Sequence, residues 1–181
     1  MLKWSLAAIA AVVVIFLIVV ALQPSDFKVE RSATMRAPAP AAFAQVNDFQ
    51  NWRVWSPWEK VDPALKRQYE GPKAGTGAVY AWQGNKDVGE GRMTIAESRP
   101  GEAVRIKLEF FKPFAAVNDT VFSFKPSAGG ANEGTTVTWT MSGQNNFIAK
   151  AMCLFVDMDK MVGGMFEQGL AQMKTVVERR P

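Results

Sequence analysis

The chain has 181 residues, a formal net charge of +4 and 48% hydrophobic residues, and its Lys and Arg residues are dispersed along it. A mild, dispersed positive charge argues against a nucleic-acid-binding surface. The chain contains no histidine and one cysteine, Cys153, so an intramolecular disulfide is excluded. Nucleophilic catalysis by Ser-His or Cys-His pairs is excluded too, as is the commonest transition-metal ligand. Any chemistry must rest on carboxylates, Lys, Arg or Tyr, and we expect no metal and no cofactor.

An uncharged apolar segment lies close to the N-terminus. Residues 4–22 include no charged residue, Gly or Pro, and a helix over this range would extend about 28 Å, close to the hydrocarbon thickness of a bilayer. We predict a single transmembrane helix. The alternative is a cleaved signal peptide with its cleavage site at 19–21, but a signal peptide core usually has roughly 7–15 apolar residues.

Basic residues flank this segment on both sides, so their count alone does not fix its orientation. Lys3 precedes it, while Lys28, Arg31 and Arg36 follow it. A long domain translocates largely regardless of such charges, whereas a short basic N-terminal tail usually stays in the cytoplasm. We therefore expect a single-pass protein with its C-terminal domain on the extracytoplasmic, periplasmic side of the membrane.

The remaining chain is predicted to form one domain. After a linker at 23–26, residues 27–181 have the size of one ordinary domain and are enough to bury a core. Its first predicted elements are a strand and two short helical segments, at 27–35, 41–46 and 48–53. Alternating apolar and polar residues predict the strand, and Pro38 and Pro40 end it before the first helix.

From residue 65 onward apolar residues recur at every second position, and clusters of Gly, Pro, Asn and Ser separate the runs. This pattern predicts an antiparallel meander with strands at 65–70, 78–83, 89–98, 103–111, 118–125 and 135–142. Val104, Ile106 and Leu108 illustrate the apolar set, and Arg105 and Lys107 the polar set. The sheet should therefore have one dry face and one solvated face.

The C-terminal segment, 157–178, carries apolar residues at three-and-four spacing, which predicts a long amphipathic helix. Such a helix would cover the dry face of a curved sheet, so the expected fold class is α+β. Gly163, Gly164 and Gly169 interrupt it, each at about 1 kcal/mol relative to Ala. Close packing on the sheet, or room for a ligand, would offset that cost. Residues 147–155 are expected to form a short helix or a lid.

Five segments carry a family pattern: NWRVWSPW at 51–58, GTGAVYAW at 75–82, GEGRMTI at 89–95, TTVTWTM at 135–141 and FEQGLAQMK at 166–174. These segments and the order of the predicted elements resemble the helix-grip fold of the START-like (SRPBCC) superfamily, in its polyketide cyclase/dehydrase and lipid-transport branch. In that fold a curved antiparallel sheet surrounds a long C-terminal helix. The resemblance covers nearly the whole predicted domain.

This resemblance implies a deep hydrophobic cavity between the sheet and the long helix that holds a lipid, a polyketide or another apolar small molecule. The residues expected to line it are Tyr80, Trp82, Met93, Ile95, Phe110, Phe122, Trp139, Met141, Met158, Met161 and Met165. Met suits adaptable apolar binding, but it also fills irregular cores without any ligand. The expected partners are therefore a hydrophobic small molecule or lipid and the membrane, and the sequence identifies no protein partner.

The acidic residues of the meander fall on or beside outward positions and form no recognisable acid/base pair: Glu90, Glu97, Glu102, Glu109 and Asp119. We therefore predict a membrane-tethered binding protein that is not an enzyme. Two alternatives stay open, namely a polyketide cyclase or dehydratase that uses Tyr80 or a carboxylate inside the cavity, and an interaction module for another envelope protein. Trp52, Trp55 and Trp58 are expected in the core, at the cavity mouth or in a membrane-facing aromatic cluster.

Overall fold

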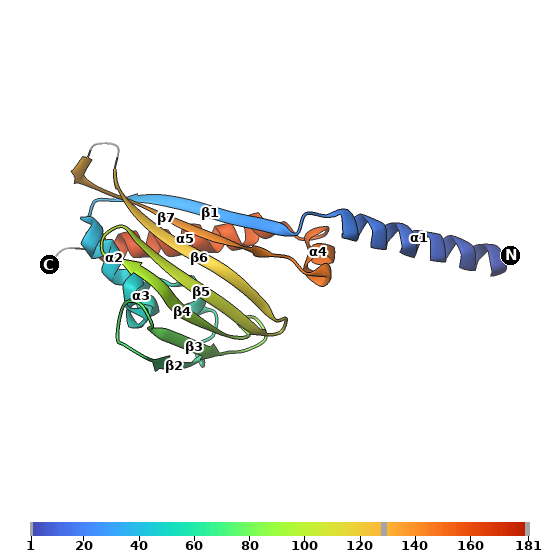
Figure 1. Cartoon of the computed structure of the whole chain (residues 1–181), viewed down its shortest axis with the longest axis horizontal. Helices are drawn as coiled ribbons and strands as arrows, with labels where there is room; N and C mark the ends of the chain where they lie inside the picture. The colour runs from blue at the N-terminus through green and yellow to red at the C-terminus, as the bar shows by residue number, and fades with distance from the viewer. Residues whose placement is uncertain (1, 128–129, 180–181) are drawn as a thin grey trace.

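The computed structural model describes residues 2–127 and 130–179, and a long N-terminal helix leaves the rest of the molecule as an arm (Figure 1). This helix, α1 (Leu2–Leu22), contains the span Trp4–Leu22, which has a mean hydropathy of 3.2 and is long and apolar enough to cross a membrane. A signal sequence would have the same properties. Within this span Val20 alone is buried, at the end of the helix that meets the domain.

Seven antiparallel strands form a single sheet: β1 (Asp26–Met35), β2 (Lys66–Glu70), β3 (Val79–Gln83), β4 (Glu90–Arg99), β5 (Ala103–Lys112), β6 (Ala116–Ser127) and β7 (Gly130–Gln144). Their order across the sheet is β1-β7-β6-β5-β4-β3-β2, so the first strand pairs with the last. Val29 lies opposite Met141, and Tyr80 lies opposite Met93. The predicted meander is confirmed, and β1 extends it through its pairing with β7.

The strand ends differ most from the prediction at the β6–β7 hairpin. We expected a long break at 127–134, whereas β6 continues to Ser127 and β7 already begins at Gly130. Positions 128–129 of that predicted break lie outside the described residues. The ladder continues through Pro126 opposite Thr135 and, after a register shift, through Ser127 opposite Gly130. Backbone pairing needs no apolar side chains, so the alternation of residue types could not show these extensions.

The two edges of the sheet are protected in different ways. Helix α5 (Met158–Glu178) packs along the edge strand β1. The opposite edge strand, β2, has five residues with the sequence KRQYE, and most of its side chains are exposed. A short, charged edge strand discourages pairing with another chain.

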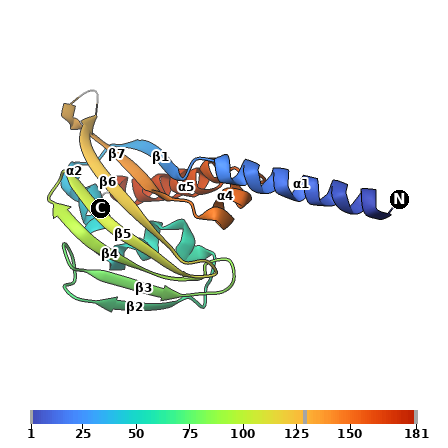
Figure 2. The same ribbon diagram turned by 45° about the vertical axis from the view of Figure 1, so that its right-hand side comes forward.

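Apart from α1, the long helices lie on one face of the sheet, as Figures 1 and 2 show. The segment between β1 and β2 contains α2 (Ala39–Asn47), the 3₁₀ turn η1 (Phe49–Asn51), α3 (Trp52–Trp55) and the 3₁₀ turn η2 (Pro57–Lys60). A short helix, α4 (Phe147–Cys153), connects β7 to α5. This combination of a curved antiparallel sheet and a long C-terminal helix is the helix-grip arrangement, which confirms the predicted fold class.

Aromatic side chains form the centre of the core between sheet and helices. Trp139 of β7 stacks on Phe166 of α5 with ring centroids 4.0 Å apart and an interplanar angle of 8°. Trp52 and Trp55 of α3 are 3% and 0% exposed and pack against Phe122 and Trp139. Of the positions expected for the tryptophans, the structure therefore gives Trp52 and Trp55 the one in the core.

Close packing explains two of the three glycines in α5. A Cβ atom at Gly169 would lie 3.0 Å from Cζ3 of Trp139, and one at Gly163 would collide with the guanidinium group of Arg31. Gly164 faces open space, since nothing lies within 4 Å of a Cβ built there. The helix thus approaches the sheet closely at Gly163 and Gly169, and this approach fixes which side of α5 faces inward.

Candidate functional site

A cavity of about 220 Å³ lies between the inner face of the sheet and α5. Six of the residues predicted to line such a cavity do so, and they come from β3, β4, β5 and β7: Tyr80, Trp82, Met93, Phe110, Trp139 and Met141. Other apolar lining residues include Leu108 of β5 and Trp58 of η2. These six residues lie in the cavity wall formed by the sheet, and their part in ligand binding stays a prediction.

The remaining predicted residues lie elsewhere. Ile95 and Phe122 are 1% and 0% exposed and belong to the packed core. Met158, Met161 and Met165 of α5 are not among the residues that line the cavity, and Met161 is 54% exposed. Successive helical residues differ by about 100° around the axis, so a stripe displaced by one position presents a different face.

Helix α5 contributes Val162 and Phe166 to the cavity instead of the three methionines. Both residues follow directly after a methionine that we expected to face inward, Met161 and Met165. The helix cannot rotate to bring those methionines inward, because Gly163 and Gly169 must face Arg31 and Trp139.

A carboxylate reaches the cavity from η2, where the sequence had indicated none. The side chain of Glu59 lines the cavity and is 6% exposed. Its Oε1 accepts a 2.7 Å hydrogen bond from the Tyr80 hydroxyl, and its Oε2 accepts a 2.7 Å hydrogen bond from Nε of Arg67. Glu59 thus joins η2 to strands β2 and β3 at one end of the cavity.

These contacts set the protonation states of the cluster. Burial, and then the hydrogen bond to Glu59, raises the pKa of Tyr80 well above its ordinary value. The hydrogen bond from Arg67 to Glu59 also raises the pKa of Arg67. At neutral pH Tyr80 is therefore a protonated hydrogen-bond donor beside a carboxylate that an arginine neutralises. The cluster adds polar groups to a cavity whose lining is mostly apolar and also includes Ser56 and Asp87.

Two buried polar atoms in the cavity wall have no hydrogen-bond partner within the described part of the chain. They are Oγ1 of Thr120 and Nε1 of Trp139, in residues that are 3% and 2% exposed. Thr120 of β6 lies opposite Met141 of β7. Trp139 precedes Met141 by two residues in β7, so Thr120 and Trp139 are diagonal neighbours on the same face of the sheet. Diagonal side chains of a sheet are about 7–8 Å apart, within reach of one ligand. Leaving such a group unpaired costs about 1–3 kcal/mol.

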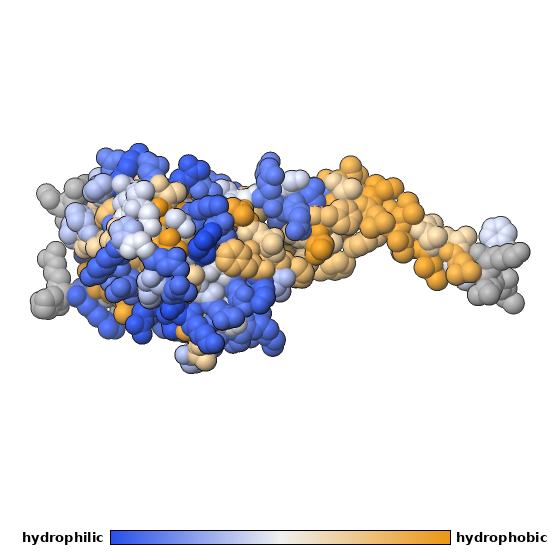
Figure 3. Space-filling model, turned by 60° about the horizontal axis from the view of Figure 1, so that its bottom comes forward, coloured by the Kyte–Doolittle hydropathy of each residue, from blue (hydrophilic) through white to orange (hydrophobic). Residues whose placement is uncertain are grey.

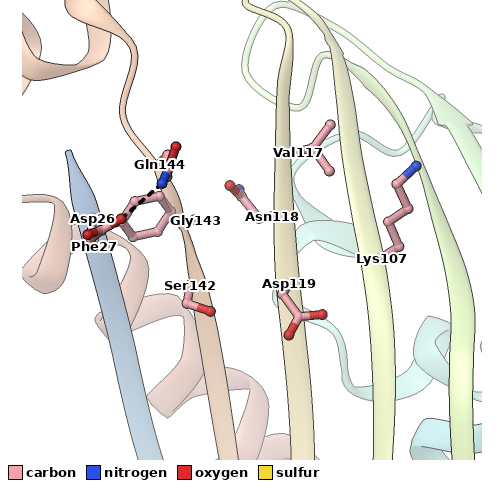
Figure 4. Close-up of a pocket in the computed structure, with 9 residues that line it drawn as sticks. All are labelled: Asp26, Phe27, Lys107, Val117, Asn118, Asp119, Ser142, Gly143 and Gln144. Atoms are coloured by element: carbon pink, nitrogen blue, oxygen red, sulfur yellow. Dashed lines mark hydrogen bonds between the residues drawn. The ribbon is translucent and has the colours of Figure 1, made fainter.

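A larger but shallow depression of about 620 Å³ lies at one end of strands β1, β5, β6 and β7 (Figure 4). Its side chains spread over four strands without converging on a point, and the hydrogen bond drawn there joins Gln144 to Asp26 at 3.2 Å. In this bond the side-chain amide of Gln144 donates to the carboxylate of Asp26. We therefore place the candidate site in the cavity between the sheet and α5.

Metal chemistry finds no support in the residues described. No group of three or more His, Cys, Asp or Glu side chains in residues 2–127 and 130–179 is arranged to hold a metal ion. The candidate site is instead an apolar cavity with hydrogen-bonding groups at two places: the Glu59–Tyr80–Arg67 cluster, and the unpaired atoms of Thr120 and Trp139.

The fold and the cavity together define a helix-grip domain. The chain belongs to the family described as "Polyketide cyclase / dehydrase and lipid transport", whose model matches residues 26–178. No curated protein matches the chain.

Solved structures share the fold at low sequence identity. Protein CV1439 from Chromobacterium violaceum is 14% identical with a TM-score of 0.60, over 84% of this chain and 98% of that one. A protein from Thermobifida fusca is 21% identical with a TM-score of 0.61, over 84% and 93%. The di-domain ARO/CYC BexL from the BE-7585A biosynthetic pathway is 16% identical with a TM-score of 0.62. The similarity covers 90% of this chain and 53% of BexL.

Proposed function

We propose that this protein is a membrane-tethered binding protein whose cavity holds a hydrophobic small molecule, a lipid or polyketide-like compound. Helix α1 is its single-pass anchor, and the domain lies on the extracytoplasmic side. The observation that carries the proposal is the largely apolar cavity between the sheet and α5. Thr120 and Trp139, whose Oγ1 and Nε1 atoms have no hydrogen-bond partner among the described residues, belong to its wall.

The two atoms define what the ligand must offer. The indole N–H of Trp139 only donates, whereas the Thr120 hydroxyl both donates and accepts. A carbonyl or hydroxyl oxygen on an apolar body would satisfy both groups while the remaining surface meets Leu108, Met141 and Val162. The cavity is smaller than the roughly 300–1,000 Å³ of typical ligand pockets. It therefore suits a small ring system or part of an acyl chain.

Tethering to a bilayer would increase the rate at which the cavity meets hydrophobic ligands. A domain held at the membrane meets membrane-dissolved ligands at a high effective concentration without any additional contact. The family description, which includes lipid transport, supports the same class of ligand.

Native mass spectrometry of the full chain in lipid nanodiscs tests the proposal. We expect a bound mass of lipid or polyketide size that is lost in Val162→Trp, because the larger side chain fills the cavity. The matched control is Val54→Trp on the exposed surface of α3, where the side chain is 59% exposed, and it should retain the mass. Empty spectra for the wild-type protein, with no displacement of a hydrophobic dye, would contradict the proposal.

A second candidate function, a polyketide cyclase or dehydratase, is favoured by the Glu59–Tyr80 pair. The Tyr80 hydroxyl would turn its one hydrogen bond from Glu59 to a substrate carbonyl, and the Glu59 carboxylate released in this way would accept a proton from the adjacent carbon. Incubation of the protein with a poly-β-keto thioester separates the two functions. Cyclised or dehydrated product that disappears in both Tyr80→Phe and Glu59→Gln supports the enzyme, whereas unchanged substrate bound to the protein supports the binding function.

A further inference from the structure

Exposed apolar side chains gather on α4 and on the chain that follows it. We define the α4 patch as Phe147, Ile148, Met152, Phe155 and Met161, which are 48%, 55%, 45%, 79% and 54% exposed. Lys150 is the one charged residue between positions 147 and 156. Figure 3 shows hydrophobic atoms continuing from α1 onto the adjoining end of the domain, while most of the visible face is hydrophilic. A contiguous patch of this kind marks an interaction surface.

The α4 patch touches the membrane-spanning helix directly. The ring of Phe155 lies 6.4 Å from the ring of Phe16 in α1, and Val20 of α1 is fully buried near the same junction. Phe16 precedes Leu22, the last residue of α1, by six positions, which corresponds to about 9 Å along the helix. Amphipathic segments that lie in a membrane interface embed their apolar side about 5–10 Å deep. Phe155 therefore lies at the depth of an interfacial side chain when α1 spans a bilayer.

A second apolar projection lies at the β5–β6 hairpin. Phe111, Phe114 and Val117 are 51%, 53% and 59% exposed. In Figures 1 and 2 this hairpin points towards the end of the domain from which α1 leaves. The hairpin and the α4 patch thus lie at the same end of the domain as the anchor.

Both projections follow or precede lining residues of the cavity directly in the sequence. Phe110 lines it while the next residue, Phe111, is exposed at the hairpin, and Val162 lines it while the preceding residue, Met161, belongs to the α4 patch. The cavity therefore lies next to the apolar end of the domain.

We infer that the α4 patch and the β5–β6 hairpin lie in the lipid interface, so that the bilayer covers this end of the domain and the cavity opens towards lipid. The inference rests on the membrane anchor of the proposed function and adds a second, non-spanning contact with the membrane. A hydrophobic ligand would pass between bilayer and cavity without crossing water.

Depth measurements with nitroxide labels on the full chain in phosphatidylcholine/phosphatidylglycerol vesicles test this arrangement. In a Cys153→Ser background, a single label is placed through Phe155→Cys or Phe114→Cys. Ile15→Cys in α1 is the lipid reference, and Val54→Cys in α3 is the aqueous reference. The readout is the ratio of accessibility to oxygen and to a water-soluble nickel chelate. Circular dichroism checks folding, and Ile148→Cys replaces any variant of Phe155 that misfolds.

We expect ratios at positions 155 and 114 on the lipid side, several-fold above the ratio at position 54. If position 15 lies in lipid while 155 and 114 are as aqueous as 54, the docking is overturned and the anchor stands. If position 15 is itself aqueous, the anchor of the proposed function fails and the docking fails with it. Spin–spin broadening at position 155 that disappears on dilution with unlabelled protein would place a second copy on the patch and overturn the inference.

Discussion

The Tyr80 hydroxyl donates a 2.7 Å hydrogen bond to Oε1 of Glu59. Tyr80 lies in strand β3, and Glu59 lies in the 3₁₀ turn η2, which precedes the meander in the sequence. The same carboxylate is held by Arg67 of the edge strand β2. One acidic side chain thus connects the helical segment to two strands and also lines the cavity. The packing of η2 on the sheet and the polar groups of the cavity therefore depend on the same three residues, Glu59, Arg67 and Tyr80.

Replacing Glu59 should destabilise the protein. Glu59→Gln leaves Arg67, whose side chain is 21% exposed, without its carboxylate partner and should lower the free energy of unfolding by about 1–3 kcal/mol. Thermal unfolding in detergent, followed by circular dichroism, measures the change. Glu30→Gln is the matched control, because the Lys28–Glu30 ion pair is largely exposed and its loss should change little. Equal effects of the two substitutions would contradict this prediction.

Stability should fall at alkaline pH through Tyr80. Its pKa is raised in the folded protein by burial and by the hydrogen bond to Glu59, whereas in the unfolded chain it is about 10. Above that pH the unfolded chain loses the proton that the folded protein keeps, so the contribution present below pH 10 is lost as pH rises. Unfolding measured between pH 8 and 11 should show this decline, and Tyr80→Phe should flatten it. A Tyr80→Phe curve parallel to the wild-type curve would refute the assignment.

Thr120→Val should separate stability from binding. The substitution removes an unpaired buried hydroxyl and should raise the free energy of unfolding of the ligand-free protein by about 1 kcal/mol. If the hydroxyl bonds to the ligand, the affinity for a hydrophobic dye bearing a carbonyl should fall about 2- to 13-fold, since one hydrogen bond contributes roughly 0.5–1.5 kcal/mol. Dye titration and thermal unfolding on the same samples give both quantities. Unchanged affinity would remove Thr120 from the ligand site.

Substitution by alanine at two adjacent glycines in α5 should change the stability of the protein differently. Gly164→Ala faces open space and should stabilise the helix by about 0.5–1 kcal/mol. Gly163→Ala displaces the Arg31 guanidinium group, which is held by Asp159 at 2.8 Å and by Glu167 at 2.7 Å, and should be less stable than Gly164→Ala. Chemical denaturation of the two variants side by side tests the order of their stabilities. The reverse order would show that Arg31 moves aside without loss.

The sequence was informative where a regular element repeats one pattern. Alternation located the strands and six lining residues of the cavity, because successive side chains of a strand point to opposite faces. On α5 the three-and-four spacing allowed Met161 or Val162 and Met165 or Phe166, and we expected the methionines in the cavity wall. Val162 and Phe166 line the cavity instead. Apolar residues occur at both sets of positions, so composition could not choose between them. The close approach at Gly163 and Gly169, which depends on tertiary packing, makes that choice.

Glu59 could not be found from periodicity, since it lies in a four-residue 3₁₀ turn with no repeating pattern. Its role depends on a hydrogen bond across 21 positions to Tyr80 and an ion pair with Arg67. Thr120 was missed for a similar reason, because a hydroxyl in an apolar wall is notable only when its partners are known. Polar groups of a site are identified by what they contact, and sequence spacing does not report this.

If α1 anchors the protein as proposed, the charged edge strand β2 has a particular consequence. Copies that diffuse in one plane share a single orientation relative to the bilayer, so their free sheet edges lie at the same height and collide far more often than in solution. The KRQYE sequence of β2 places the charged residues Lys66 and Glu70 along that edge, while Arg67 is paired with Glu59. Two such edges related by a rotation about the membrane normal would bring these charges and the unpaired ladder groups into conflict. With the proposed anchor, we expect the strand to keep neighbouring copies separate under two-dimensional crowding.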